Sequence, residues 1–125
     1  MSSLNWNNET LHVEVNGHVA DAPFECMDQN EGQQQICFGD AASRRGVRVW
    51  LHVVPNFSGR GMQIKAGAIH DNYYDGRFQW PVEAVFDRPD LNVPPRPGQE
   101  EAYREAVLTA GNTALYGITS LTMGR

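Results

Sequence analysis

Residues 11–20, LHVEVNGHVA, decide how this chain begins to fold, because two alternating apolar runs flank the dipeptide Asn16-Gly17. Both central positions of a two-residue type I′ turn need a positive φ angle, which Asn and Gly tolerate. A turn at this point pairs Val13 with Ala20 on one face of two antiparallel strands. The segment therefore predicts a β-hairpin that begins a sheet.

The next turn decides where the two cysteines point. A three-residue loop over 30–32, with its glycine in the left-handed region, pairs Cys26 with Ile36 and joins the apolar faces of the two strands. Cys37 then points to the opposite face, so we predict two free thiols, consistent with a reducing compartment. Pro23 lacks an amide donor and places the strand before this turn at a sheet edge or at a β-bulge.

Three later segments alternate apolar and polar residues with the period of a half-buried strand; they are 47–53, 62–68 and 78–86. Gly67 weakens the second segment and indicates a bulge there. Pro81 interrupts the third segment, which we therefore place at a sheet edge. The sequence thus predicts further antiparallel strands after the first two hairpins.

The period becomes helical after a connector at 88–98, whose four prolines exclude a continuous helix or a central strand. From 99 to 124, acidic residues fill the first turns and apolar residues recur every three or four positions, which predicts a helix with one core-facing stripe. Gly111-Asn112 is expected to break this helix into two pieces. The stripe consists of Tyr103, Val107, Ala110, Ala114, Ile118 and Leu121.

These elements predict a single α+β domain over residues 1–125. It consists of an antiparallel β-meander of about six strands over 1–87, the connector at 88–98 and a helical segment over 99–124. We expect the helix to cover an open sheet or a partly closed barrel. In outline this is similar to domains of the pleckstrin-homology type, in which a β-meander ends in a capping helix. That likeness is one of topology and implies no function.

Charge is distributed unevenly along the chain. The net charge is −5, and residues 1–43 contain Asp and Glu but neither Lys nor Arg. An acidic chain is poorly suited to nonspecific binding of a phosphate backbone, so we do not expect a nucleic-acid partner. We expect instead a protein partner with a basic patch. The candidate partner-binding residues are Glu25, Asp28, Glu31 and Asp40.

The sequence also bears on the cellular compartment. No segment has the ~20 apolar residues of a membrane span. The first residues lack the basic start and apolar run of a secretory signal. We therefore expect a cytoplasmic protein without a membrane partner.

Motifs for catalysis and metal binding are missing from the sequence. It has no Gly-x-Ser-x-Gly elbow and neither His-x-x-x-His nor Cys-x-x-Cys spacing, so we expect no structural zinc site and no other cofactor. Basic residues near Trp50 and in a glycine-rich turn give a candidate anion-binding set: Arg44, Arg45, Arg48 and Arg60. A candidate ligand pocket draws on His52, His70, Asp71, Tyr73 and Trp80. Solvated arginines and core packing account for the same residues, and we prefer that interpretation.

The leading hypothesis is a small non-enzymatic protein that binds a macromolecular partner, as inhibitors, immunity proteins and anti-defence proteins do. The alternative is a small-ligand-binding domain or minor enzyme with a pocket between sheet and helix. A third hypothesis is a subunit of a larger assembly that associates through edge strands. A pocket enzyme requires a deep cavity with converging polar groups, whereas a binder requires a filled core and an exposed charged or apolar patch.

Overall fold

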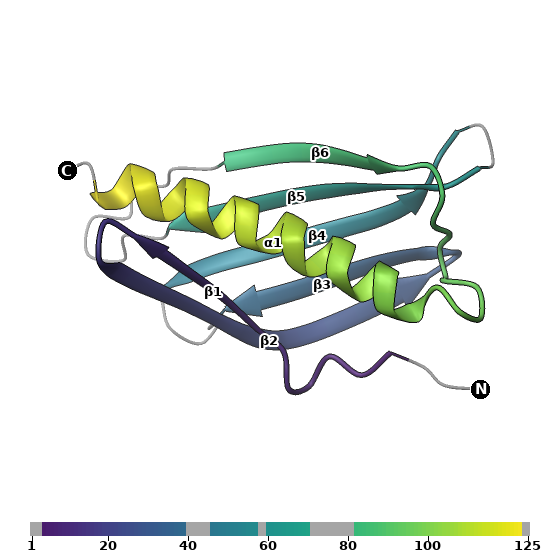
Figure 1. The fold of residues 1–125 in the computed structure, drawn as a ribbon, viewed down its shortest axis with the longest axis horizontal. Coiled ribbons are helices and arrows are strands. Elements are labelled where there is room, and N and C mark those ends of the chain that lie inside the picture. Colours follow the sequence, from purple (N-terminus) through teal and green to yellow (C-terminus); the bar gives the residue numbers. More distant parts are fainter. Residues whose placement is uncertain (1–3, 40–45, 58–59, 71–81, 124–125) are drawn as a thin grey trace.

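The computed structural model of the chain describes residues 4–39, 46–57, 60–70 and 82–123, which form a six-stranded antiparallel sheet and one helix (Figure 1). The strands follow one another across the sheet in chain order, and the curled, open sheet partly encloses the helix. The predicted α+β meander with a C-terminal helix is thus confirmed. The elements are β1 (Thr10–Val15), β2 (His18–Asn30), β3 (Gln33–Gly39), β4 (Val47–Pro55), β5 (Met62–His70), β6 (Val82–Arg88) and α1 (Glu100–Met123).

The first hairpin forms as predicted. Asn16 and Gly17 make a two-residue turn with φ angles of 51° and 82°, and Val13 lies opposite Ala20. A local signal is sufficient here because a two-residue turn fixes the register of both strands.

The second hairpin differs from the prediction. Its loop has two residues, Glu31 and Gly32, with φ angles of 51° and 77°, in place of the three expected. Cys26 consequently lies opposite Cys37, and the predicted pairing of Cys26 with Ile36 is wrong. Gly32 adopts the predicted left-handed conformation, but local sequence does not indicate the shorter loop. That loop also needs a positive φ angle at Glu31, which is uncommon for residues other than Gly, Asn and Asp.

A β-bulge in β2 makes this register compatible with a continuous apolar face. The register shifts between Phe24 and Cys26, so Phe24 lies opposite Phe38 while Met27 lies opposite Ile36. These four apolar side chains belong to the core or pack against it. One extra residue in β2 therefore keeps the apolar face inward and turns Cys26 outward.

Strand β2 changes its partner at the bulge. Among the described residues, His18–Pro23 pairs with β1, and the strand from Phe24 onward pairs with β3. Pro23 lies where β2 changes its partner and next to the bulge, and a bulge is one of the two positions predicted for this proline. No described strand pairs with the edge of Cys26–Asn30 that faces away from β3.

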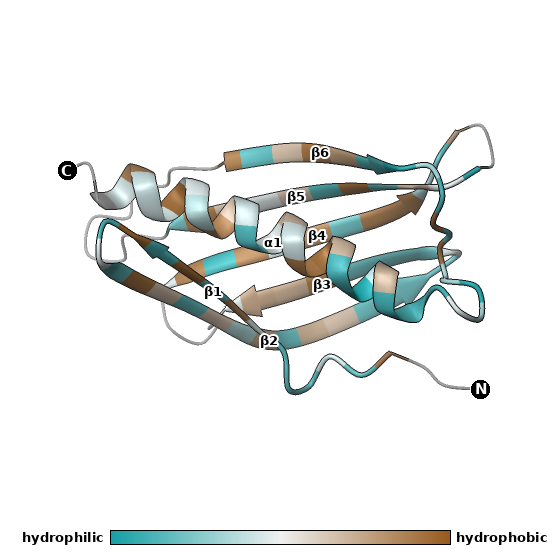
Figure 2. Cartoon of the chain, viewed as in Figure 1, coloured by the Kyte–Doolittle hydropathy of each residue, from teal (hydrophilic) through white to brown (hydrophobic). Residues whose placement is uncertain are grey.

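The core lies between the concave face of the sheet and α1. Hydrophobic and hydrophilic residues alternate along β4 (Figure 2), and its inward residues Val49, Leu51 and Val53 are buried. The predicted helical stripe is buried except for Leu121, which is 48% exposed near the end of the helix. The largest fully buried side chains are Tyr103, Phe38, Leu11, Ile36, Leu51, Met62, Ile64, Leu115 and Ile118.

Helix α1 is continuous, so the predicted break at Gly111-Asn112 is wrong. Gly111 is buried against β1, where an added Cβ would lie 2.9 Å from a methyl carbon of Leu11. The side-chain oxygen of Asn112 accepts a hydrogen bond from the backbone amide of His12 at 2.9 Å. Both residues join the helix to the sheet, and this contact offsets their low helix propensity.

The segment before β1 is attached to the middle of the fold. Trp6 is buried and packs edge-on against Phe38, with ring centroids 6.5 Å apart. The guanidinium of Arg104 lies 5.5 Å from the centroid of the Trp6 ring and donates a hydrogen bond to the Glu9 carboxylate at 2.6 Å. Arg104 and Glu9 are 95 residues apart, so sequence periodicity could not indicate their contact.

The proline-rich connector is held at both ends before α1 begins. Leu91 is buried in the core. The Gln99 side chain donates a hydrogen bond to the carbonyl of Asp90 at 2.7 Å and accepts one from the amide of Arg96 at 3.0 Å. The carbonyl of Gln99 also accepts from the amide of Tyr103 at 2.8 Å, which fixes the first turn of the helix.

Candidate functional site

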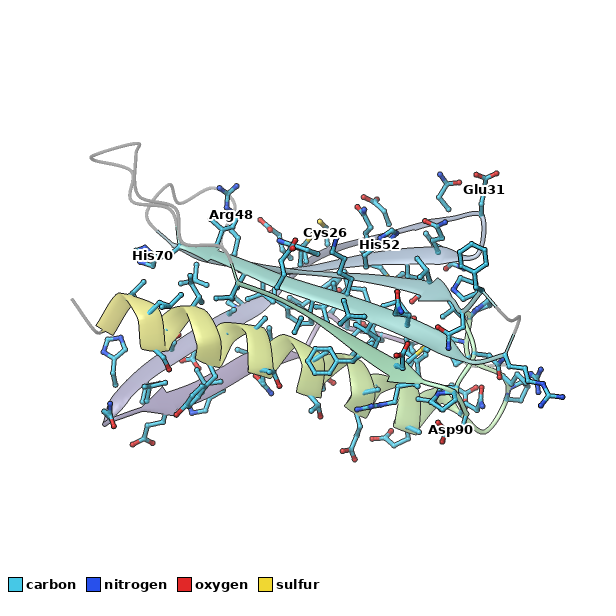
Figure 3. The ribbon with its side chains drawn as sticks, turned by 90° about the horizontal axis from the view of Figure 1, so that it is seen from above. Cys26, Glu31, Arg48, His52, His70 and Asp90 are labelled. Carbon is cyan, nitrogen blue, oxygen red and sulfur yellow. The ribbon has the colours of Figure 1, made fainter. Side chains whose placement is uncertain are left out.

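The face of the sheet that points away from α1 carries most of the described candidate residues. In Figure 3, the side chains of Cys26, Arg48 and His52 lie on this side, and the helix lies on the other. We call the surface formed by the outward residues of β2–β5 the outer face. The strand register arranges it in two rows: Cys26, Cys37, Trp50 and Gly67, and next to them Asp28, Gln35, His52 and Lys65.

Three predicted partner-binding residues lie along one stretch of β2 and its turn. Glu25, Asp28 and Glu31 are all exposed, and we call them the acidic strip. Asp40 lies outside the described residues. Lys65 shares a row with Asp28 but is three strands away, about 14 Å at the usual strand spacing. That exceeds the Debye length of about 8 Å in physiological salt, so Lys65 does little to neutralise Asp28.

The indole of Trp50 lies across β5 on the outer face. A Cβ added to Gly67 would lie 2.1 Å from Cζ2 of this ring. Strand β5 keeps a regular register on both sides of Gly67, so the predicted bulge there is wrong. The glycine instead leaves room for a half-buried aromatic ring on a polar face.

His52 borders a shallow polar hollow next to the acidic strip. Its Nε2–H donates a hydrogen bond to the side-chain oxygen of Gln33 at 3.0 Å, since an amide oxygen can only accept. The hollow has a volume of about 470 Å³ and is lined by Asp28, Gln29, Asn30, Gln33, Gln35 and His52. The hollow therefore brings together Asp28, a predicted partner-binding residue, and His52, a predicted pocket residue.

The two thiols form a pair beside the acidic strip. Cys26 is exposed, Cys37 is half-buried, and both are free. Burial raises the pKa of the Cys37 thiol to about 11, and the hydrogen-bonded Cys26 and the charges of Glu25 and Asp28 act in the same direction. Cys37 is therefore protonated at neutral pH, and it lies within the negative field of the strip.

The candidate arginines do not all come together. Arg48 lies at the first end of β4 and Arg60 in the turn beyond its other end. The distance from Arg48 to the far end of β4 at Pro55 is about 23 Å, given a rise of about 3.3 Å per residue. Arg44 and Arg45 lie outside the described residues.

The candidate pocket residues are also separated. His52 points outward from β4, whereas His70 ends β5 in the register position opposite Val47. Asp71, Tyr73 and Trp80 lie outside the described residues. The two described histidines therefore do not share a site.

A buried polar pair inside the core was missed by sequence reasoning. The phenol of Tyr103 donates a hydrogen bond to the side-chain oxygen of Gln34, and both residues are buried. Burial also raises the pKa of Tyr103. Gln34 occupies an inward position in the alternation of β3, and this position was the only feature of the sequence that could have indicated its burial.

The described part of the chain contains no group of three or more His, Cys, Asp or Glu residues that could hold a metal ion. Within the same residues, no helix is long and apolar enough to cross a membrane. Comparison with protein-family models, with curated proteins and with solved structures finds no match.

Proposed function

We propose that this chain is a small non-enzymatic protein that binds a protein partner bearing a basic patch, in the manner of inhibitors, immunity proteins and anti-defence proteins. The observation that carries the proposal is the coincidence of two features on the second half of β2. The acidic strip lies there, and the backbone edge of Cys26–Asn30 has no described strand beside it. A partner strand can add to such an edge through backbone hydrogen bonds, while its basic side chains meet the carboxylates.

The filled interior supports this proposal over a ligand pocket between sheet and helix. Tyr103, Val107 and Ile118 of α1 are fully buried against inward residues of the sheet. The hollow at His52 is instead open at the surface and lined by residues that are mostly exposed. An exposed polar hollow beside charged residues is typical of the rim of a protein interface rather than of a catalytic pocket.

Self-assembly through the β6 edge of the sheet is less favourable. Strand β6 is the last strand of the sheet, as expected for the segment marked by Pro81, and Val85 is 56% exposed on it. Two copies of β6 aligned antiparallel about Val85 would place Glu83 directly opposite Asp87. Like charges in directly opposed positions destabilise a strand pair.

The proposal is tested by reversing the charge of the acidic strip in a tagged full-length chain, with Glu25→Lys, Asp28→Lys and Glu31→Lys combined. Capture from the native lysate at low and moderate salt identifies the partner, and the affinity is then measured with both purified proteins. We expect at least about a tenfold loss of affinity in the variant, because rim charges govern electrostatic association. The free energy of unfolding should change by less than about 1 kcal/mol, as is usual for exposed positions.

A matched control changes the same total charge elsewhere. Glu14→Lys, Glu101→Lys and Glu105→Lys alter exposed residues of β1 and α1. This control should retain the affinity of the unmodified chain. Equal losses in both variants would mean that net charge, and not the acidic strip, controls binding. Unchanged affinity in the strip variant would remove the strip from the interface.

A further inference from the structure

The bulge in β2 creates an arrangement of the two cysteines that the alternation of the strands would otherwise prevent. Without the extra residue, Cys26 would share the inward parity of Phe24; with it, Cys26 turns outward and lies directly opposite Cys37. Directly opposed residues of antiparallel strands have Cα atoms about 4.5–5.5 Å apart. A disulfide requires about 4.4–6.8 Å between these atoms, so the opposed positions meet its requirement for the Cα–Cα distance.

We propose that Cys26 and Cys37 form a reversible intramolecular disulfide, with a low-molecular-weight disulfide such as glutathione disulfide as the oxidant. The two thiols are already close enough to hydrogen-bond with each other. Cys26 is exposed and is the thiol that an external reagent reaches, whereas Cys37 is half-buried behind it. This inference does not depend on the proposed partner.

The reaction proceeds in two thiol–disulfide exchanges. The Cys26 thiolate attacks one sulfur of glutathione disulfide, forms a mixed disulfide and releases a glutathione thiolate. The Cys37 thiolate then attacks Sγ of Cys26 and expels the second glutathione thiolate. Each cysteine loses one proton and each glutathione gains one, so two protein thiols and one glutathione disulfide become one protein disulfide and two glutathiones.

The second exchange is slow at neutral pH and accelerates with pH. In the reduced chain, burial and smaller contributions from Cys26, Glu25 and Asp28 raise the pKa of Cys37 from 9.0 to about 11. In the mixed disulfide Cys26 no longer carries a thiol, but burial and the two carboxylates still raise this pKa and lower the thiolate fraction. The greater nucleophilicity of a more basic thiolate recovers only part of this loss. The titratable or charged groups around Cys37 are Cys26, Glu25 and Asp28 on β2, and Arg48 and His52 on either side of Trp50 on β4.

The test exposes the full-length chain to defined ratios of oxidised and reduced glutathione and identifies the products by intact mass and peptide mapping. At the end of the reaction the unmodified chain should have lost two hydrogens and both titratable thiols, with the glutathione adduct present only as an intermediate. Trp50 lies opposite Cys37 in the next strand, so closure should also quench its fluorescence. The rate of the second step should rise about tenfold per pH unit from neutral pH toward the pKa of Cys37.

A matched control moves one thiol along the same strand and face. In the double variant Cys37→Ser with Gln35→Cys, the new thiol lies diagonal to Cys26, at about 7–8 Å, which exceeds disulfide reach. Gln35 is exposed and lies opposite Asp28, so the fold tolerates the change. This variant should stop at glutathione adducts. Adducts or intermolecular dimers as the only products of the unmodified chain, or equal closure in both chains, would overturn the proposal.

Discussion

Replacing Gly111 by alanine should destabilise the chain, whereas the same replacement at Gly117, further along α1, should stabilise it. In a helix interior, glycine is about 1 kcal/mol less favourable than alanine, and this gain applies at both positions. At Gly117 the nearest atoms to an added Cβ belong to Val82, at 3.6–3.8 Å, which is ordinary contact. Gly117→Ala should therefore stabilise by about 0.5–1 kcal/mol.

At Gly111 an added Cβ would lie 2.9 and 3.0 Å from the two methyl carbons of Leu11, against an optimum of about 3.5–4.0 Å. Leu11 is fully buried, so it cannot move aside into solvent. Overpacking of this kind costs about 1–3 kcal/mol, which exceeds the gain in helix propensity. Because that gain is common to both variants, the difference between their unfolding free energies measures the overpacking alone.

Urea denaturation followed by circular dichroism gives both free energies, and Gly117→Ala is the matched control for Gly111→Ala. Leu11→Val provides a further check, because a shorter side chain should cost less in the Gly111→Ala background than in the unmodified chain. If Gly111→Ala stabilises as much as Gly117→Ala, the glycine is not required for the approach of helix and sheet, and the reasoning is refuted.

Two other predictions concern buried and half-buried aromatic rings. Tyr103→Phe leaves the buried oxygen of Gln34 without its donor and should cost about 1–3 kcal/mol at neutral pH. Because burial raises the pKa of Tyr103 in the folded chain, this tyrosine ionises only in the unfolded chain just above about pH 10. The advantage of the unmodified chain over the variant should therefore shrink there by about 1.4 kcal/mol per pH unit. Denaturation at neutral and alkaline pH measures this, and a constant difference would contradict it. Gly67→Ala should displace the Trp50 indole, which would lie 2.1 Å from the new Cβ, at a cost of about 1–2 kcal/mol. The fluorescence emission of Trp50 should then shift to the red. An unchanged spectrum would show that the ring does not lie on Gly67.

Sequence alone predicted those parts of the fold that are determined within a few residues. The Asn16-Gly17 turn gave the first hairpin and its register, and period-two alternation gave the inward residues of β4. The second turn was predicted with its left-handed Gly32, but its length was predicted wrongly because glutamate carries no signal for a positive φ angle at Glu31.

The remaining errors come from contacts between distant residues. A helix break was predicted at Gly111 because helix propensity takes no account of Leu11, which lies against this glycine in the fold. Likewise, Gly67 was interpreted as a bulge because local sequence does not show that the Trp50 ring of the neighbouring strand lies against it. For the candidate site, plain alternation places Cys26 and Asp28 on the inward face with Phe24, and only the bulge turns both of them to the outer face.

The acidic residues of β2 also bear on how an open sheet edge avoids its own copies. Two chains aligned antiparallel along Cys26–Asn30 would place Asp28 opposite Asp28, and like charges in that position oppose pairing. A partner strand with Lys or Arg converts the same repulsion into attraction, so one residue both excludes the wrong partner and selects the right one. Salt screens both effects. Self-association measured by sedimentation should therefore increase with salt while the affinity for the partner decreases, and salt dependences of the same sign would show that this edge is not the binding site.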